Sequence, residues 1–359
     1  MIYLDYQATT PLAPEALDAM LPWLAGPAAP GFANPHSPHR AGRAAAAAVE
    51  VARAHVAALL PPGGRVIFTS GATEALNIAL AGSGARALAV SAIEHAAVLD
   101  TARALDPDLC VLRVSTDGRV APDVAIPHGT GLVAVMQVNN EIGTIQPITQ
   151  LAARAHAMGA LFVCDAVQGA GKLAAPDGAD MVAISAHKLH GPKGIGALWV
   201  RDGVALTPLI HGGGQEGGLR SGTLSPALCA GFGAAAALCK SRWTSDGEHV
   251  ERLWTKARAL FSDWTLNGSA DERWHGNLSL RRPGLDVGRL LSECRNIAFS
   301  AGSACASGSG RPSHVLRALG LSDRDSKSTI RIGFGRYTRE EELEQAAAVL
   351  NAAAQAQGV

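Results

Sequence analysis

The chain has 359 residues, of which 48% are hydrophobic and 17% are charged, which excludes a disordered chain and predicts two domains or one large one. Lys plus Arg and Asp plus Glu both total 31, so the net charge gives no reason to bind nucleic acid or an anionic membrane. The N-terminus has neither a basic nor an apolar signal region, and no apolar stretch is long enough to predict a membrane span. The six cysteines include no C-x-x-C pair and their usage suits a reducing compartment, so we expect a cytoplasmic protein.

Seven short apolar segments alternate with helical segments in the first two thirds of the chain. The predicted strands cover residues 66–68, 88–91, 111–114, 132–138, 161–165, 181–185 and 195–200. Helical stretches such as 74–81 and 148–158 lie between them. This alternation predicts an α/β fold with a mostly parallel sheet, helices on both faces, and ligands at the carboxyl ends of the strands.

The pattern changes after about residue 240, where four tryptophans occur in a more polar sequence. A Gly/Ser-rich loop and a final helix from about Arg339 follow. We predict a large domain over residues 10–241, and a small α+β domain formed by residues 1–9 and 242–359.

The segment TSGATE (69–74) follows a predicted strand and begins a predicted helix. Free N–H groups and the helix dipole form an anion site at such a turn, and Thr73 would add a hydroxyl. The alternative is that Ser70 or Thr73 only caps the helix. A P-loop is not predicted, because the turn lacks Gly-Lys-Ser/Thr.

Two further segments together suggest a pyridoxal phosphate site. Asp165 ends a predicted strand, where a carboxylate can hold a cationic ring nitrogen, although it could also cap a helix. Lys188 and Lys193 lie in SAHKLHGPKG, after the next strand. A lysine that forms a Schiff base needs desolvation or cationic neighbours. Spacing does not choose between the two lysines, and one of them can be a surface charge.

Other candidates follow strands or lie in glycine-rich loops. His95 can stack on a flat ring and move protons, and Asn140 can donate to a ring oxygen, although both also fit ordinary loops or turns. The glycine-rich segment 211–223 predicts unusual dihedrals, a close backbone approach or mere flexibility. Cys305 lies among Gly and Ser, where a thiol can reach a substrate but can also be incidental. Arg331 can bind a carboxylate through two hydrogen bonds.

Eleven sequence blocks, spread over nearly the whole chain, carry a family resemblance. They are LDYQATTP (4–11), ANPHS (33–37), TSGATEALN (69–77), EHAAVLDT (94–101), VNNEIGTIQP (138–147), DAVQGAGK (165–172), SAHKLHGPKGIGAL (185–198), HGGGQEGGLRSGTL (211–224), SAGSACASG (300–308), PSHVLRALG (312–320) and IRIGFGR (330–336). In combination they resemble the NifS/IscS-type cysteine desulfurases, pyridoxal 5'-phosphate enzymes of the class V aminotransferase group. The resemblance implies a fold-type I homodimer with a seven-stranded sheet in its large domain and the cofactor near the subunit interface.

The resemblance also implies a role for each candidate, by motif position. Lys188 would form the Schiff base with the cofactor and move the substrate Cα proton, while His95 would stack on the ring and assist proton transfer. The implied cofactor contacts are Ala72 (backbone), Thr73, Ser185 and His187 at the phosphate, with Thr223 from the partner subunit, Asp165 at the ring nitrogen, and Gln168 and Asn140 at the ring hydroxyl oxygen. Asn34 and Arg331 would hold the substrate carboxylate.

The implied reaction takes sulfur from L-cysteine, leaving L-alanine and a persulfide on Cys305. The long stretch between Cys305 and PSHVLRALG favours the mobile-loop NifS/IscS branch over the SufS type. The sulfur would serve an iron–sulfur scaffold or another acceptor, with no resident metal, although Cys305 could ligate a transferred iron–sulfur cluster. The sequence ends at Val359, short of the tail with which many relatives dock a scaffold, so that partnership stays open.

Three alternatives remain. Cys305 argues against another class V activity such as an aminotransferase, which needs no cysteine opposite the cofactor. A selenocysteine lyase is harder to separate, because the same architecture accepts either chalcogen. A non-catalytic sulfur-carrier scaffold is disfavoured because Lys188, Asp165, His95 and Cys305 are all present. The one departure beside the lysine, SAHK in place of the more usual SGHK, is expected to be tolerated.

Overall fold

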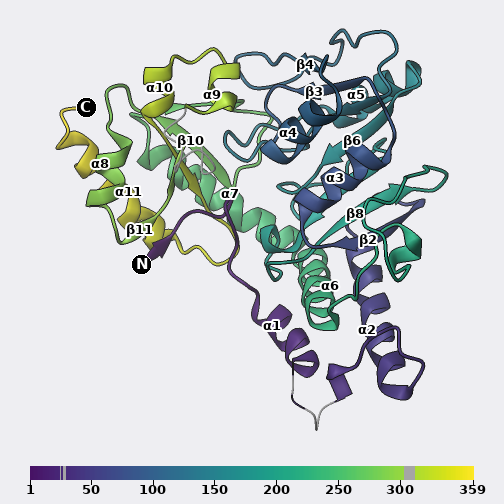
Figure 1. The fold of residues 1–359 in the computed structure, drawn as a ribbon. Coiled ribbons are helices and arrows are strands. Elements are labelled where there is room, and N and C mark those ends of the chain that lie inside the picture. Colours follow the sequence, from purple (N-terminus) through teal and green to yellow (C-terminus); the bar gives the residue numbers. More distant parts are fainter. Residues whose placement is uncertain (25, 27–29, 303–311) are drawn as a thin grey trace.

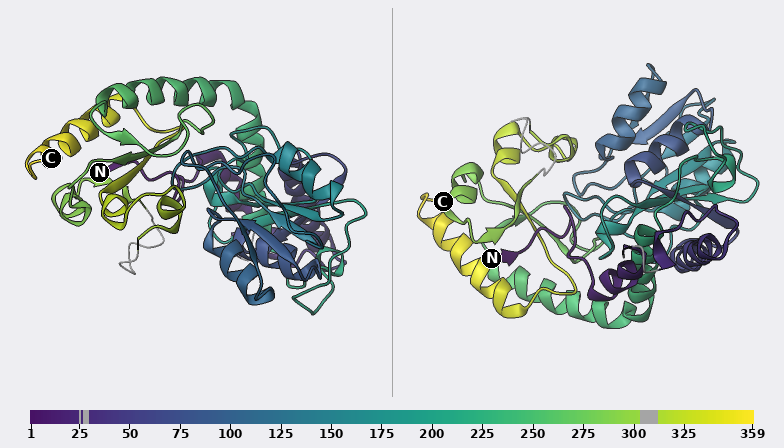
Figure 2. Two further views of the ribbon diagram at one scale, coloured as in Figure 1. Left: turned by 90° about the horizontal axis from the view of Figure 1, so that it is seen from above. Right: turned by 60° about the horizontal axis from the view of Figure 1, so that its bottom comes forward.

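The computed structural model describes residues 1–359 except for residues 25, 27–29 and 303–311 (Figure 1). Two lobes, each with its own sheet and core, are joined by a helical connection and by the N-terminal segment (Figure 2). Cys305 falls in the last gap and so lies outside the described residues.

The larger lobe contains a seven-stranded sheet in the order β2-β8-β7-β6-β5-β3-β4. Its strands are β2 (Gly64–Thr69), β3 (Leu88–Ser91), β4 (Cys110–Leu112), β5 (Leu132–Ala134), β6 (Leu161–Asp165), β7 (Met181–Ser185) and β8 (Gly196–Arg201). Only β8 pairs antiparallel with its neighbours, so the predicted mostly parallel sheet is confirmed. The prediction for 132–138 was too long, because β5 ends at Ala134 and Val138 pairs instead with Ile145 in an isolated bridge.

Helices cover both faces of this sheet, because alternate strand residues point to opposite sides. In β6, Phe162 and Cys164 pack into one core and Val163 into the other. The first core includes residues of α1 (Pro14–Met20), α2 (Arg40–Ala57), α5 (Ile148–Ala157) and α6 (Pro226–Ser241), and the second those of α3 (Ala72–Gly82) and α4 (Ala96–Leu105). The sheet is therefore the buried middle layer of three.

The helical connection between the lobes is α6 followed by α7 (Trp243–Leu260). Pro226 occupies the first turn of α6, and the Ser225 side chain accepts a hydrogen bond from Leu228 N at 3.4 Å, which fixes where the helix begins. Arg242 separates the two helices. From there α7 runs along the smaller lobe (Figure 2).

The smaller lobe contains a four-stranded antiparallel sheet in the order β12-β13-β10-β9. Its strands are β9 (Thr265–Leu266), β10 (Asn277–Arg281), β12 (Ser300–Ala301) and β13 (Thr329–Gly333), and a separate pair joins β1 (Ile2–Tyr3) to β11 (Ile297–Ala298). Its helices are α7, α8 (Val287–Glu293), α9 (His314–Ala318), α10 (Asp323–Lys327) and α11 (Glu340–Gln355). The limits predicted for the two domains stay a prediction.

Short 3-10 helices complete the described secondary structure. They are Leu21–Trp23, Pro30–Phe32, Ala186–Lys188 and Glu216–Gly218. Among the helices of the described residues, none is long and apolar enough to cross a membrane.

Candidate active site

A cavity of about 580 Å³ lies where the carboxyl ends of the large sheet face the smaller lobe. The predicted site residues that line it are Ala72, Thr73, His95, Asn140, Asp165, Gln168, Ser185, His187, Lys188 and Arg331. Asn34 and Thr223 are exposed and do not line it, and Cys305 lies outside the described residues. One hollow thus brings together ten side chains from segments far apart in the sequence.

The turn between β2 and α3 forms one end of the cavity. Gly71 is the N-cap of α3, with no side-chain capping bond, so the alternative that Ser70 or Thr73 caps this helix is wrong. The first N–H groups of a helix lack intrahelical partners and carry the positive end of its dipole. The sheet approaches this turn closely, because a Cβ at Gly196 would lie only 2.7 Å from the carbonyl carbon of Gly71.

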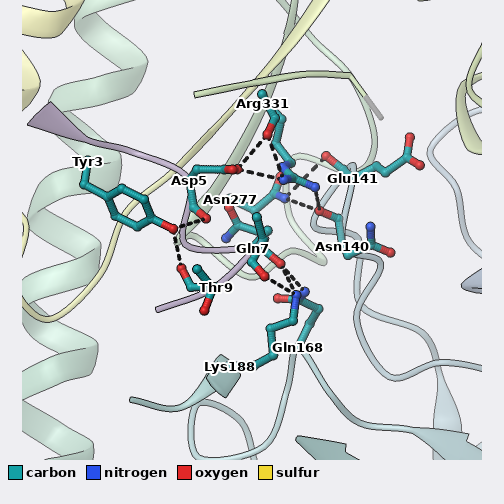
Figure 3. Close-up of polar contacts among 12 residues, drawn as sticks. Tyr3, Asp5, Gln7, Thr9, Asn140, Glu141, Gln168, Lys188, Asn277 and Arg331 are labelled. Carbon is teal, nitrogen blue, oxygen red and sulfur yellow. Dashed lines mark hydrogen bonds and ion pairs between the residues drawn. The ribbon is translucent and has the colours of Figure 1, made fainter. Parts of the chain in front are cut away.

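Lys188 ends the 3-10 helix that follows β7. Its Nζ donates hydrogen bonds to the carbonyl oxygens of Gln7 and of Ala8, the latter at 2.9 Å (Figure 3). Lys193 is exposed at the edge of the same cavity. Packing therefore distinguishes two lysines that their spacing in the sequence did not.

His187 lies beside Lys188, and its Nδ1 is 3.1 Å from Thr9 Oγ1. Burial, followed by the nearby charges of Lys188 and Lys193, lowers the pKa of His187 to about 4. The imidazole is therefore neutral at pH 7, and one of its ring nitrogens carries a proton that can be donated.

Asp165 is 6% exposed at the end of β6, and its Oδ1 accepts a hydrogen bond from Val167 N at 2.9 Å. Burial raises the pKa of this carboxyl, and the charges of His95 and Lys188 oppose that effect. No helix follows it directly, so helix capping does not explain Asp165. A cation bound next to Asp165 would stabilise its charged form.

Gln168 follows Asp165 in the chain and lies in the turn after β6. Its Nε2 donates to Gln7 O at 3.0 Å, whereas its buried Oε1 has no hydrogen-bond partner among the described residues. Such an orphaned polar atom at the wall of a cavity leaves a place for a polar group of a ligand.

His95 is the N-cap of α4, where its Nδ1 accepts a hydrogen bond from Ala97 N at 3.1 Å. In the neutral ring this bond leaves the proton on Nε2.

The two neighbouring asparagines at 139 and 140 have different surroundings. Asn139 Oδ1 accepts hydrogen bonds from the N–H groups of Glu141 and Ile142, which builds the turn. Asn140 is then the one that lines the cavity.

Arg331 comes from β13 on the opposite side of the cavity, and its side chain is 1% exposed. Its Nη2 lies 2.8 Å from Asp5 Oδ1, and its Nη1 donates to Asn140 O at 3.1 Å (Figure 3). Its Nε is buried and has no partner in the described part of the chain. A guanidinium so held presents a fixed positive charge to a carboxylate.

Two buried carboxyl groups lie behind these residues. Glu94 accepts hydrogen bonds from Ser91 Oγ and Met136 N, and burial, which outweighs these bonds, raises its pKa to about 8. Glu141 accepts from Ser313 Oγ at 2.5 Å, and burial raises its pKa to about 7. Both are protonated over part of the neutral range.

Sequence reasoning assigned no role to Asp5, Gln7 or Glu94. Gln7 contacts Lys188 through its backbone carbonyl, and such a contact leaves no mark in residue type. The only available signal for Asp5 and Gln7 was that both lie in the block LDYQATTP.

The model of the family described as aminotransferase class-V matches residues 2–346. The chain belongs to the class-V aminotransferase family. It is 40% identical to a cysteine desulfurase IscS of Rickettsia akari, over 96% of this chain and 89% of that protein. It is 44% identical to a mitochondrial cysteine desulfurase of Saccharomyces cerevisiae, over 96% of this chain and 73% of that one. The structure of a NifS-like protein superposes with a TM-score of 0.88 at 30% identity, covering 98% of both chains.

The class-V aminotransferases that this chain resembles are pyridoxal 5'-phosphate enzymes, and this chain is one of them. Its cavity fits the cofactor chemically. The start of α3 suits a phosphate, buried Asp165 suits a cationic ring nitrogen, and the orphaned Gln168 Oε1 leaves room for a further polar contact.

Proposed function

We propose that this class-V enzyme is a cysteine desulfurase, which takes sulfur from L-cysteine, releases L-alanine and leaves a persulfide on Cys305. The observation that carries the proposal is that a lysine, a buried carboxylate and a buried arginine, from three separate elements, line one cavity. Relatives that match 96% of this chain, at 40% and 44% identity, carry the name cysteine desulfurase, which supports the same substrate.

The bound cofactor would supply an electron sink for the negative charge that develops at the substrate Cα. Asp165 would hold the ring N–H, and Gln168 and Asn140 would contact the ring hydroxyl oxygen. The N–H groups of Ala72 and Thr73 would hold the phosphate. Ser185 and His187 would add neutral donors there, which is consistent with the lowered pKa of His187.

The chain's own groups would carry out the remaining tasks. Lys188 would bind the cofactor covalently and move the Cα proton, and the carbonyls of Gln7 and Ala8 orient its Nζ for this. Arg331 would hold the substrate carboxylate, whereas Asn34, to which the resemblance gives the same role, lies outside this chain's cavity. His95 would cover the ring and donate or accept a proton at Nε2.

Assembly and sulfur delivery are part of the same proposal. Thr223 is exposed and lies away from this chain's cavity, as a residue supplied to a partner subunit would, so we propose a homodimer. The IscS name of a relative supports delivery of sulfur to iron–sulfur cluster assembly. The cytoplasm is the proposed location, although some relatives are mitochondrial and one is mitosomal.

The test is alanine formation from L-cysteine under a thiol reductant, for wild type and Cys305→Ser. Turnover by the wild type alone is expected, because a hydroxyl cannot accept the sulfur. Cys110→Ser is a matched control, since Cys110 is a half-buried thiol on β4 away from the cavity. Equal turnover in Cys305→Ser would assign the sulfur to another acceptor. Activity with L-selenocysteine but not L-cysteine would favour the selenocysteine lyase instead.

A further inference from the structure

A second cavity, of about 100 Å³, lies at the junction of the two lobes and is separate from the active site. We call it the junction cavity, and define it by Gln7, Lys172, Trp243, Trp274, Phe334 and Arg336. One water needs roughly 10–15 Å³ of such a cavity, so the junction cavity has room for a small ion with some of its water.

Positive charge exceeds negative charge around the junction cavity. The charged side chains that line it are Lys172, Arg336 and Asp246, which leaves one positive charge in excess. His190 adds none, because burial lowers its pKa to about 3. An excess charge away from bulk water is costly unless a counter-ion compensates it.

The two cations have unused hydrogen-bonding capacity. The Arg336 side chain is 4% exposed; two of its nitrogens bond Asp246, but buried Nη1 has no partner among the residues that the structure describes. The Lys172 ammonium lies 5.9 Å from the centre of the Trp274 ring. No hydrogen bond or ion pair joins it to another described residue. Aromatic rings and unpaired cationic donors together form the wall of an anion site.

We propose that the junction cavity binds one small oxyanion, such as a carboxylate or sulfate, between Lys172 and Arg336. The ammonium would act as a charged donor, and the guanidinium would offer its unpaired Nη1. Gln7 separates this site from the active site, since it lines both cavities. The site therefore goes beyond the desulfurase proposal and does not depend on it.

The site has a pH dependence of its own. The groups that face Lys172 are Lys188, Cys239, His190, Arg336 and Asp246. Burial, and then the charge of Lys188, lowers the pKa of Lys172 to about 8. Anion affinity is expected to be constant below that pH and to fall by about tenfold per pH unit above it, as Lys172 loses its proton.

The experiment is isothermal titration of the cofactor-loaded enzyme with sodium formate and with sodium sulfate at pH 7. Ionic strength is held constant with sodium chloride, whose anion is not an oxyanion. We expect one saturable site per chain. Lys172→Met should weaken binding on the order of 10- to 100-fold, because a hydrogen bond to a charged group is lost.

Three variants complete the test. Lys240→Met removes an exposed lysine at the end of α6 and should bind like wild type, and Lys172→Arg should restore binding. Arg331→Lys should still bind the anion in the junction cavity, which distinguishes this site from the pocket for the substrate carboxylate. The proposal is overturned if wild type shows no saturable binding, if Lys172→Met binds equally well, or if Arg331→Lys abolishes binding.

Discussion

The two walls of the active-site cavity are assembled in different ways. On the sheet wall, each candidate follows a strand: Thr73 comes after β2, His95 after β3, Asp165 ends β6 and Lys188 follows β7. On the opposite wall, Arg331 of β13 pairs with a residue 326 positions away, Asp5. The sheet wall therefore depends on one sheet edge, and the opposite wall on the pairing of two distant chain segments within the smaller lobe, which meets the larger lobe where Arg331 Nη1 donates to Asn140 O. We expect sheet-wall changes to alter cofactor chemistry and kcat, and opposite-wall changes to alter KM.

The largest expected effect is that of Lys188→Ala on the sheet wall. Loss of the nitrogen that we propose bonds the cofactor and moves the proton should lower kcat by on the order of 10³-fold. The visible absorbance of covalently held cofactor should disappear, while Lys193→Ala should keep it. Covalent absorbance that survived in Lys188→Ala and vanished in Lys193→Ala would move the role to Lys193.

Asp165→Asn should lower kcat by on the order of 10²-fold and leave KM for cysteine nearly unchanged, because the ring nitrogen would lose the anionic partner that we propose for it. The measurement is the rate of Cα deprotonation in a stopped-flow experiment. Asp106→Asn is the matched control: that carboxyl is equally buried but accepts from Leu88 N, away from the cavity. An unchanged deprotonation rate in Asp165→Asn would contradict the assignment.

Arg331→Lys tests the opposite wall. A point charge replaces the planar fork, so KM for cysteine should rise on the order of 10-fold while kcat changes less. Steady-state kinetics of alanine formation measure both constants. Arg281→Lys, on the neighbouring strand β10 and outside the cavity, should leave both unchanged. A fall in kcat with a constant KM would place Arg331 with the sheet-wall residues and remove the contrast.

The smallest effect concerns Glu94, which lies behind the sheet wall. Its folded-state pKa of about 8 lies above its unfolded value, so its contribution to stability is complete below about pH 4.5 and is lost as pH rises towards 8. Glu94→Gln mimics the protonated form and keeps an oxygen for Ser91 and Met136. Urea unfolding should therefore depend less on pH between 5 and 8 in this variant. An unchanged pH dependence would mean that Glu94 titrates normally.

The contrast between the walls also explains what could be predicted from the sequence. Seven strands follow from local apolar runs, and residues at their carboxyl ends must meet at one edge, so His95, Asp165 and the lysines of SAHKLHGPKG were predicted to lie together. The choice of Lys188 over Lys193 came from the family resemblance. Arg331 was singled out by its chemistry, but its partner Asp5 was not, because the two residues lie near opposite ends of the chain and meet only where Asp5 pairs with Gly333 of β13 within the smaller lobe.

Some choices depended on packing alone. Which asparagine of the pair at 139–140 builds the turn is a matter of side-chain direction. The roles of Asn34, Thr223 and Cys305 stay predictions, since the first two lie away from this chain's cavity and the third lies outside the described residues.

The N-terminal segment, whose Gln7 and Ala8 carbonyls accept hydrogen bonds from Lys188, contacts both lobes. It runs from β1, which pairs with β11, to α1, which packs against α6. If Lys188 bonds the cofactor as proposed, its nitrogen would have fewer protons to donate to the carbonyl of Ala8. A half-buried acceptor that loses its donor would cost about 1 kcal/mol unless the backbone shifts. Cofactor loading and the relative orientation of the lobes would therefore be thermodynamically coupled. By reciprocity, whatever fixes that orientation also changes how tightly the cofactor is held.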